Sequence, residues 1–348
     1  MQFIRPALLA TTILTASMTT AFADVRVVTS IKPVHSLVAA VMQGVGTPDL
    51  IVEGAGSPHT YALKPSQAKQ LQEADLVFWM SHDLEAFLEK SIDGIATKAV
   101  SVPLMESRGL MTLGFREGGA FDDHGHDEHD DHDEHDKDDD HDHEKHDDHD
   151  EHEKHDKDDD HDHEKHDDHD EHDHGEVDPH VWLDPENAKA MVHEIEEALA
   201  KADPANAATY ESNAEAVMAK LDSLVAEIDS ELQPVKGRGY IVFHDAYQYF
   251  ENRFGVSAIG SITVSPEVLP GAERISDLQE KVRSLDATCV FSEPQFEPKL
   301  VATVTENTNA RTGVLDPLGA AIDKGPNLYF TLIRNMASSL KNCLLGSG

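Results

Sequence analysis

The sequence has few basic residues and no long apolar run. It contains 28 Lys and Arg against 67 Asp and Glu, which gives a formal net charge of −39. Binding to nucleic acid requires the opposite sign of charge, so we do not expect a nucleic acid as a partner. No segment reaches the roughly 18 consecutive apolar residues of a membrane-spanning helix, and we expect the mature chain to be soluble.

Cysteine is also scarce, because Cys289 and Cys343 are the only two in the sequence. In an exported protein, a minimal even number of cysteines suggests one disulfide, with two buried free thiols as the alternative. Closing a loop of about 54 residues would stabilise the fold by roughly 4 kcal/mol in the chain-entropy model.

The N-terminus predicts export. Arg5 is followed by a short apolar run from Ala7 to Met18 and by Ala21-Phe22-Ala23, an A-x-A cleavage site. This pattern is typical of a secretory signal peptide over residues 1–23, with Asp24 as the first mature residue. There is no cysteine near the cleavage point, so we do not expect a lipid anchor.

The negative charge is concentrated in one tract. Between Asp122 and Asp178 the sequence has 32 acidic residues and 5 lysines, and it holds 17 of the 23 histidines. A ten-residue unit, Lys137 to His146, recurs at 157–166 without any apolar face. We predict a disordered loop over 122–177 that binds several zinc or similar ions weakly, and less so below about pH 6 as imidazoles protonate.

The rest of the chain predicts two lobes of the α/β class with mainly parallel sheets. Strand and helix patterns alternate in an N-terminal lobe, 24–184, which includes the tract, and again in a C-terminal lobe, 236–348. A helical connection over 185–235 separates them. Its apolar positions from Ala205 to Leu232 step by threes and fours, which predicts one helix about 42 Å long, enough to reach from one lobe to the other.

Three histidines outside the tract lie in constrained settings. His59 follows a predicted strand in a Gly/Pro loop, His180 follows Pro179, and His244 ends a predicted strand. Ligands of open α/β sheets bind beyond the carboxyl ends of the strands. Any one of these histidines alone would more often be a surface or core residue, but together they predict a site where the three meet on one metal ion, for which zinc is suited.

Other candidates remain less defined. Asp316 follows a predicted strand and is either a fourth ligand, a partner that orients a histidine, or a turn residue before Pro317. His35 and His193 lie on predicted helices and are interpreted as structural, whereas His82 follows a strand end and could lie near the site. Asp245 is interpreted as the cap of the next helix.

These motifs together resemble a known family, the zinc-binding proteins of bacterial high-affinity zinc ABC importers, within the metal-specific periplasmic solute-binding proteins. The resemblance covers essentially the whole mature chain. It is carried by the acidic His-rich loop and by Gly56-Ser57-Pro58-His59, Pro179-His180-Val181-Trp182-Leu183, Phe243-His244-Asp245-Ala246-Tyr247, Cys289-Val290-Phe291-Ser292-Glu293-Pro294-Gln295-Phe296 and Leu315-Asp316-Pro317-Leu318-Gly319.

The resemblance implies two α/β lobes joined by a rigid long helix, with zinc held between them by His59, His180 and His244. Some members place a Glu ligand directly before the first histidine, where this chain has Pro58, so water or Asp316 would complete the site. Manganese-type relatives have a carboxylate in place of His244, so this histidine favours zinc. The implied function is capture of zinc in the periplasm and delivery to an inner-membrane ABC permease with its ATPase, by a monomer without enzymatic activity.

Two other functions are compatible with parts of the pattern. Three histidines with an open position also describe a catalytic site, so a zinc-dependent hydrolase is the main alternative. The sequence has no HExxH motif and no clear general base for it. A metal-binding surface adhesin would need an anchor, and none is visible.

Overall fold

The computed structural model describes residues 25–116, 121, 177–263, 270–284 and 289–346. The predicted signal peptide and the acidic tract up to residue 176 lie outside the described residues. Where the chain is described, no helix has both the length and the apolar character needed to cross a bilayer.

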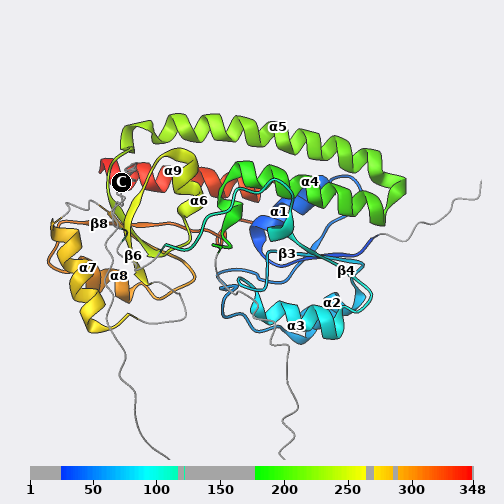
Figure 1. Ribbon diagram of the computed structural model, residues 1–348, viewed down its shortest axis with the longest axis horizontal. Helices are drawn as coiled ribbons and strands as arrows, with labels where there is room; N and C mark the ends of the chain where they lie inside the picture. The colour runs from blue at the N-terminus through cyan, green and yellow to red at the C-terminus, as the bar shows by residue number, and fades with distance from the viewer. Residues whose placement is uncertain (1–24, 117–120, 122–176, 264–269, 285–288, 347–348) are drawn as a thin grey trace, which may run out of the picture. The chain divides into compact units, whose positions relative to one another are not determined.

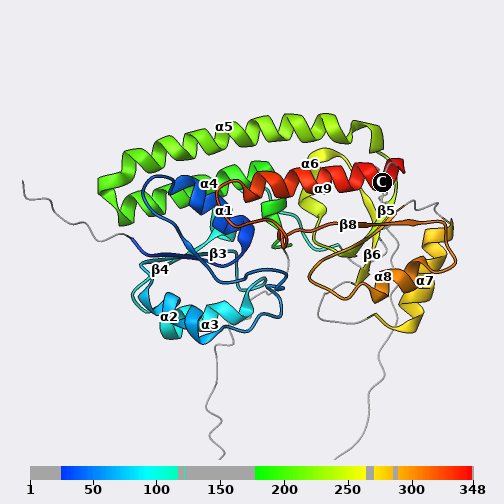
Figure 2. The same ribbon diagram turned by 180° about the vertical axis from the view of Figure 1, so that it is seen from behind.

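The first lobe is built on a sheet of four parallel strands in the order β2-β1-β3-β4. In both ribbon views α1 lies on one side of this sheet, and α2 and α3 lie on the other (Figures 1 and 2). The elements are β1 (Val27–Thr29), α1 (Lys32–Val41), β2 (Asp49–Leu50), α2 (Pro65–Glu73), β3 (Leu76–Trp79), α3 (Ala86–Ile95), β4 (Val100–Pro103) and the short 3₁₀ helix η1 (Leu104–Glu106).

The second lobe repeats this topology with a parallel sheet in the order β6-β5-β7-β8. In each lobe the first strand along the chain lies between the second and the third. The chain therefore adds its second strand on one side of the first and its third strand on the other side. Ligand sites form at such switch points. The elements are β5 (Tyr240–His244), α6 (Gln248–Phe254), β6 (Ala258–Thr263), α7 (Ala272–Ser284), β7 (Cys289–Ser292), α8 (Lys299–Thr305), β8 (Arg311–Val314) and α9 (Leu328–Leu345).

The stretch that links the two sheets is helical from Val181 onward, whereas the predicted connection begins at residue 185. It consists of η2 (Val181–Leu183), α4 (Pro185–Ala202), η3 (Pro204–Asn206), α5 (Ala207–Leu232) and η4 (Gln233–Val235). With 26 residues, α5 is about 39 Å long, and Figure 1 shows it running past both lobes. Its buried positions are the predicted ones, spaced by three or four: Tyr210, Ala214, Val217, Leu221, Leu224, Ile228 and Leu232.

A single hydrophobic core joins the lobes. It includes Phe78 of the first sheet and Tyr240 and Phe291 of the second. Successive side chains of a strand point to opposite faces. Accordingly Tyr240 and Val242 of β5 belong to this shared core, whereas Ile241 and Phe243 pack in a second cluster with α7 and α8. The two-lobed parallel α/β prediction is confirmed, and the lobes share buried apolar surface.

A buried lysine adds a polar link between the lobes. Lys32, at the start of α1, donates from Nζ to the carbonyl oxygens of Gly319, Ala320 and Ile322 at 2.7, 3.0 and 2.6 Å. Burial lowers the pKa of this lysine, and nearby carboxylates, Asp316 first, act against that. All three ammonium hydrogens therefore have acceptors on the segment that follows β8.

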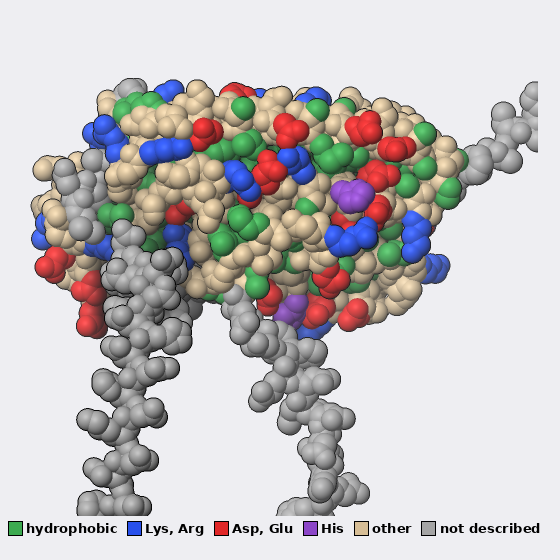
Figure 3. Space-filling model, turned by 45° about the horizontal axis from the view of Figure 1, so that its top comes forward, with side chains coloured by type: hydrophobic (Ala, Val, Ile, Leu, Met, Phe, Trp, Pro, Cys, Tyr) green, Lys and Arg blue, Asp and Glu red, His purple; other side chains and the backbone are tan. Residues whose placement is uncertain are grey.

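Surface charge in the described part is mixed in sign. Figure 3 shows acidic and basic side chains interspersed over the face that it presents. Many of them pair, such as Arg334 with Glu227 at 2.7 Å between α9 and α5. The tract supplies most of the net charge, about −27 of the formal −39.

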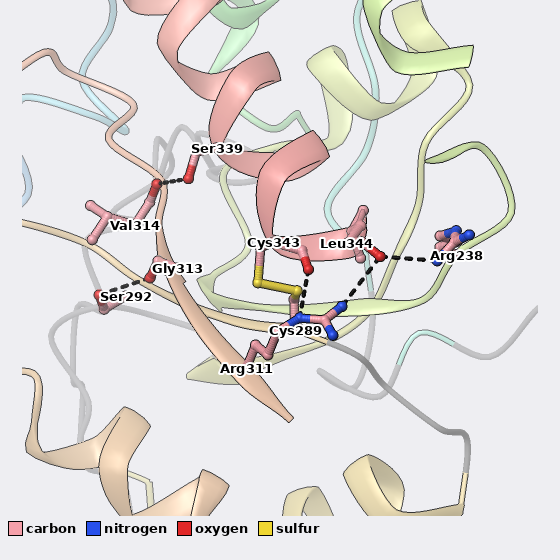
Figure 4. Close-up of a disulfide and its surroundings, with 9 residues drawn as sticks. All are labelled: Arg238, Cys289, Ser292, Arg311, Gly313, Val314, Ser339, Cys343 and Leu344. Atoms are coloured by element: carbon pink, nitrogen blue, oxygen red, sulfur yellow. Dashed lines mark hydrogen bonds between the residues drawn. A yellow bond between two sulfur atoms is a disulfide. The ribbon is translucent and has the colours of Figure 1, made fainter. Parts of the chain in front are cut away.

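The predicted disulfide is present between Cys289 and Cys343, with 6.1 Å between their Cα atoms. It links the first residue of β7 to the last turn of α9 (Figure 4). Arg311 and Arg238 donate to the carbonyl oxygens of Cys343 and Leu344 at 2.7 and 2.9 Å. These arginines satisfy carbonyls that the end of a helix would leave unpaired.

Removing the disulfide should lower the free energy of unfolding by about 4 kcal/mol, because the unfolded chain is freed from a closed loop. The test is urea denaturation of a variant carrying both Cys289→Ala and Cys343→Ala. Wild-type protein unfolded with a reductant present is the matched control and should lose a similar amount. A loss below about 1 kcal/mol in both would contradict a stabilising role for this bond.

A second prediction concerns His35, which α1 buries against the core and whose Nε2 lies 3.2 Å from the carbonyl oxygen of Pro48. Burial lowers the pKa of His35 to about 4. Unfolded His35 takes up a proton below about pH 6.5, whereas folded His35 stays neutral, so acid favours unfolding between these values. From pH 7 to pH 5 this residue should remove about 2 kcal/mol of stability.

The measurement is urea unfolding of metal-free protein at both pH values for wild type and His35→Gln, which can keep a donor to Pro48. The variant should lose about 2 kcal/mol less than wild type over this interval. His193→Gln, on the exposed side of α4, should behave like wild type. Equal losses in all three proteins would rule out His35 as the source.

Candidate metal centre

The structure brings His59, His180 and His244 together. One ligand atom from each lies within 4.8 Å of the others, and their ring centroids are 5.4 to 5.9 Å apart. Within the described part of the chain, these residues form the one cluster of three or more His, Cys, Asp or Glu residues with such spacing. His59 follows β2 of the first sheet, His180 directly precedes η2, and His244 is the last residue of β5 in the second sheet.

The strand register of the second lobe explains the place of His244. β5 pairs with β7 in parallel, with Tyr240 opposite Cys289 and Ile241 opposite Val290. Continuing this register places His244 opposite Glu293, at the switch point of the sheet. Glu293 is 3% exposed, and its Oε1 lies 2.7 Å from His244 Nδ1. His244 Nε2 is buried and has no hydrogen-bond partner in the described chain.

His180 is held in the same way by a carboxylate two residues earlier. Asp178 Oδ1 accepts from the backbone N–H of His180 at 3.0 Å and lies 2.6 Å from its Nδ1. Asp178 is fully buried and is itself fixed by α6, since Gln248 donates to its Oδ2 and Tyr249 to its carbonyl oxygen. With Nδ1 bound to a carboxylate, Nε2 is the nitrogen of His180 left for a metal.

His59 is positioned by the loop after β2. Tyr61 donates to the carbonyl oxygen of Ile51 at 3.1 Å and accepts from Gln67 at 2.9 Å, which ties the loop back to its strand and to α2. A Cβ on Gly56 would come within 3.1 Å of the Tyr61 ring, so the close approach here favours glycine. His59 is half-buried, whereas His180 and His244 are each 4% exposed.

Electrostatics shift the pKa values of His59 and His244 in opposite directions. Burial and the neighbouring His180 and His244 lower the pKa of His59 to about 2. At His244 burial also acts to lower the pKa, but the Glu293 carboxylate outweighs it and the pKa is raised. A cation bound to Nε2 would replace a proton there, so metal binding at this site should release protons.

The cavity beside the three histidines is small. It has a volume of about 10 Å³, roughly what one water molecule or one ion needs. Its wall combines the imidazoles with apolar groups, one hydroxyl, one carboxylate and one amide. Its residues are Ser57, Pro58, His59, His180, Trp182, His244, Glu293, Gln295, Phe296, Pro317 and Leu318. Such a site can hold an ion and has little room for an organic substrate.

The other predicted candidates lie outside the group of three. Asp316 accepts hydrogen bonds from the backbone of the turn that follows it and from Gln295. His82 pairs with Glu89 at 2.7 Å on a half-exposed surface. His35 is a buried residue of α1, and His193 lies beside Glu196 and Glu197 on α4, so both lie on helices, as predicted, and outside the group of three.

The interpretation of Asp245 as a helix cap was wrong. The residue preceding α6 is Tyr247, and no side chain caps that helix. Arg116, 129 residues earlier, donates to both Asp245 and Glu251, and all three groups are largely buried. A buried cation with two carboxylates is a stronger attraction for Asp245 than a solvated helix end.

Sequence reasoning also missed the residues that support the ligands. Asp178 and Glu293 were not singled out, although Asp178 stands in the Asp-Pro-His motif and Glu293 follows a predicted strand. The parallel register places the residue after β7 opposite the end of β5, and this relation follows only once the strand order is known.

Comparison with known proteins agrees with this site. A family model described as "Zinc-uptake complex component A periplasmic" matches residues 27–343. The chain is 58% identical over 318 residues to a high-affinity zinc uptake system protein ZnuA of Brucella abortus, covering 91% of each chain. It is 34% identical over 343 residues to the protein of that name from Yersinia pestis, covering 99% of this chain and 98% of the relative.

The fold has solved counterparts. A structure titled "Crystal structure of ZnuA" aligns with a TM-score of 0.70 at 22% identity, covering 92% of this chain and 99% of that one. This likeness concerns the fold, whereas the family follows from the model match and from the sequence identity of the relatives. The expected periplasmic location and zinc as the cargo agree with these relationships. The chain therefore belongs to the family of periplasmic zinc-uptake components, the zinc-binding proteins of zinc uptake systems.

Proposed function

We propose that His59, His180 and His244 each contribute one ring nitrogen to a single zinc ion, with Nε2 as the ligand atom of His180 and His244. The observation that carries this proposal is the buried, unpartnered Nε2 of His244 beside two other imidazoles. A tetrahedral zinc with bonds of about 2.05 Å needs nitrogens roughly 3.4 Å apart. Since they lie within 4.8 Å, each pair closes by no more than about 1.4 Å.

The carboxylates behind the ligands set orientation and basicity. Asp178 and Glu293 each hold an Nδ1, so the rings of His180 and His244 are turned before the ion arrives. In other metal sites, carboxylate partners of this kind typically strengthen metal binding by about 10- to 100-fold. Uptake of zinc then needs little reorientation of these two rings.

Delivery follows from which ligand faces solvent. His59 is the one ligand of the three with appreciable exposure, and it stands on a loop, whereas the other two are buried. The ion enters and leaves past His59. The family function implies a membrane permease with its ATPase as the receiving partner, and docking that displaces the His59 loop would open the site.

We further propose that lobe movement is small and that the protein acts as a monomer. The shared core, α5 and the Lys32 link all resist hinge opening. Domain closure around a ligand requires a few residues that absorb large backbone changes, and the connection here is helical for most of its length. The function is capture and release, without a catalytic step; the hydrolase alternative is unsupported by the relatives and by the small cavity.

Replacing His244 with Ala should reduce zinc affinity by at least about a thousandfold, since one of three protein ligands is lost and Glu293 is left buried without its partner. Glu293→Gln keeps the ligand and should cost about 10- to 100-fold. The measurement is competition of metal-free protein with a chelator of known zinc affinity.

His193→Ala is the matched control, because it removes an exposed histidine from α4 without touching the site, and its affinity should equal that of wild type. Far-ultraviolet circular dichroism establishes that each variant is folded. Tight binding retained by folded His244→Ala would exclude the three-histidine site.

For the acidic tract we propose an auxiliary role, as a low-affinity zinc collector or sensor. Val177, the last residue of the loop predicted over 122–177, pairs with Gly114, and the next residue is Asp178. A deletion should therefore remove 122–174 and leave Asp178 in place. Isothermal titration should then show one tight event in both proteins, with additional weak events in the full chain only, because tract imidazoles lack fixed geometry.

A second variant with every tract histidine changed to Ser keeps the length and the acidic charge. It should lose the weak events as the deletion does, which assigns them to imidazole. Loss of the tight event on deletion would mean that the tract contributes a ligand to the site.

A further inference from the structure

The fourth position of the proposed zinc site has no evident protein ligand. Pro58 precedes His59, so no carboxylate stands there. The Asp316 carboxylate is occupied by the turn that follows it: Oδ1 accepts from the backbone N–H groups of Leu318 and Gly319, at 3.2 and 2.9 Å, and Oδ2 accepts from Ala320 at 2.6 Å. Moving Asp316 onto a metal would leave those three donors unpaired, at a cost of roughly 1–3 kcal/mol each if buried.

Gln295 contacts both Asp316 and the cavity beside the histidines. It lines the cavity with them, and its Nε2 donates to Asp316 Oδ1 at 3.0 Å. This contact fixes the amide orientation, because a carboxylate accepts hydrogen bonds and would repel the amide oxygen. The two amide atoms, which are otherwise easily interchanged, therefore have distinct places here.

The other end of the amide is unsatisfied. Gln295 Oε1 is buried and has no hydrogen-bond partner in the described part of the chain. A buried acceptor without a donor is destabilising, and native proteins rarely retain one without a reason. The missing partner must be a donor, and its place is the wall of a cavity that holds about one water molecule and three imidazoles.

We propose that Gln295 Oε1 accepts a hydrogen bond from a water molecule that is the fourth ligand of the bound zinc ion, which makes Gln295 a positioning residue for this site. The inference rests on the proposed three-histidine site. A metal-bound water is a strong donor, so it satisfies the orphaned oxygen, and Asp316 acts on the ion through Gln295 rather than as a ligand.

The arrangement has a consequence for the choice of fourth ligand. An amide oxygen next to the open position attracts a donor and repels an anion that carries no hydrogen. Water is thereby favoured over a halide or azide, and the ion keeps its full charge among neutral imidazoles.

The test uses Gln295→Met, which has similar length and no polar atom, in the full mature chain. The turn at Asp316 keeps its three backbone donors in this variant, so we expect it to fold. Zinc should still bind with a stoichiometry of one, and its dissociation constant should rise about tenfold, the effect of one hydrogen bond to a charged group. Gln279→Met, on α7 away from the cavity, should match wild type.

Two spectroscopic readouts on the cobalt(II)-loaded protein separate positioning from mere structural support. Wild type should show broadening of its electron paramagnetic resonance signal in ¹⁷O-enriched water, which identifies a water ligand. Titration with azide, followed by visible absorption, should give tighter azide binding in Gln295→Met than in wild type. Gln295→Asn, which retains the amide but shortens the side chain, should also lose affinity and guards against failure of the first variant to fold.

The proposal is overturned if wild type shows no ¹⁷O broadening while Gln295→Met loses affinity, because Gln295 would then bind the metal directly. It is also overturned if Gln295→Met and Gln295→Asn match wild type in zinc affinity and azide binding. His244→Ala distinguishes these outcomes from failure of the site itself: if that variant still binds zinc tightly, the three-histidine assignment has failed. If His244→Ala loses tight zinc binding but the Gln295 variants match wild type in zinc affinity and azide binding, the water assignment alone has failed.

Discussion

Two buried carboxylate–imidazole pairs are the interactions on which the site depends. Glu293 with His244 and Asp178 with His180 each take the Nδ1 of a ring and leave Nε2 toward the cavity. Burying a carboxylate is costly unless it is paired. In each pair the imidazole offsets the desolvation cost of the buried carboxylate. A single contact thus fixes the ring angle, selects the nitrogen and raises its affinity for a cation.

These pairs need a frame that keeps three chain segments in register. The parallel sheet of the second lobe places Glu293 opposite His244, and α6 holds Asp178 through Gln248 and Tyr249. The first lobe contributes only His59, from a loop. The protein therefore has two rigid ligands and one adaptable ligand, an arrangement that combines prior orientation with a route for release.

The links between the lobes serve the same end. Lys32 holds the carbonyls of the segment that begins with Asp316, and Trp182 donates to Pro317 in the cavity wall at 2.9 Å. Tyr329 of α9 in turn donates to the carbonyl oxygen of Trp182 at 2.7 Å. Because these contacts cross between lobes around the cavity, opening one lobe would break several buried hydrogen bonds at once. Each such bond contributes about 1 kcal/mol net, so large hinge motion is disfavoured.

Much of this could be predicted from the sequence, for identifiable reasons. The apolar spacing along α5 and the alternation of strands and helices are local patterns. The α5 helix begins two residues after the start of the predicted pattern and ends at its last residue, Leu232. The three histidines were found because each lies beside a proline, a glycine or a strand end. The disulfide followed from there being only two cysteines, and the structure confirms it.

The errors and omissions involve contacts between distant parts of the chain. Arg116 reaches Asp245 across 129 residues, and no local pattern signals that a helix cap has a stronger competitor. Glu293 became visible as a partner of His244 only once the order of strands was known, because the lobe could have paired β5 with other neighbours. Asp316 follows a strand, as predicted. Its oxygens nevertheless accept hydrogen bonds from the backbone N–H groups of the next turn, which its position in the sequence did not reveal.

The choice of neutral ligands explains how tight capture and release can coexist. A carboxylate in the first coordination sphere would add Coulomb attraction in a poorly solvated site, and removing the ion would then leave an unpaired charge behind. Here the carboxylates lie behind the imidazole rings and contact Nδ1, so they keep a partner whether or not zinc is bound. When the ion leaves, His244 can take up a proton on Nε2 and remain paired with Glu293. The metal-free state is thus stabilised by the same contacts that orient the ligands. Release of the ion leaves no buried carboxylate without a partner.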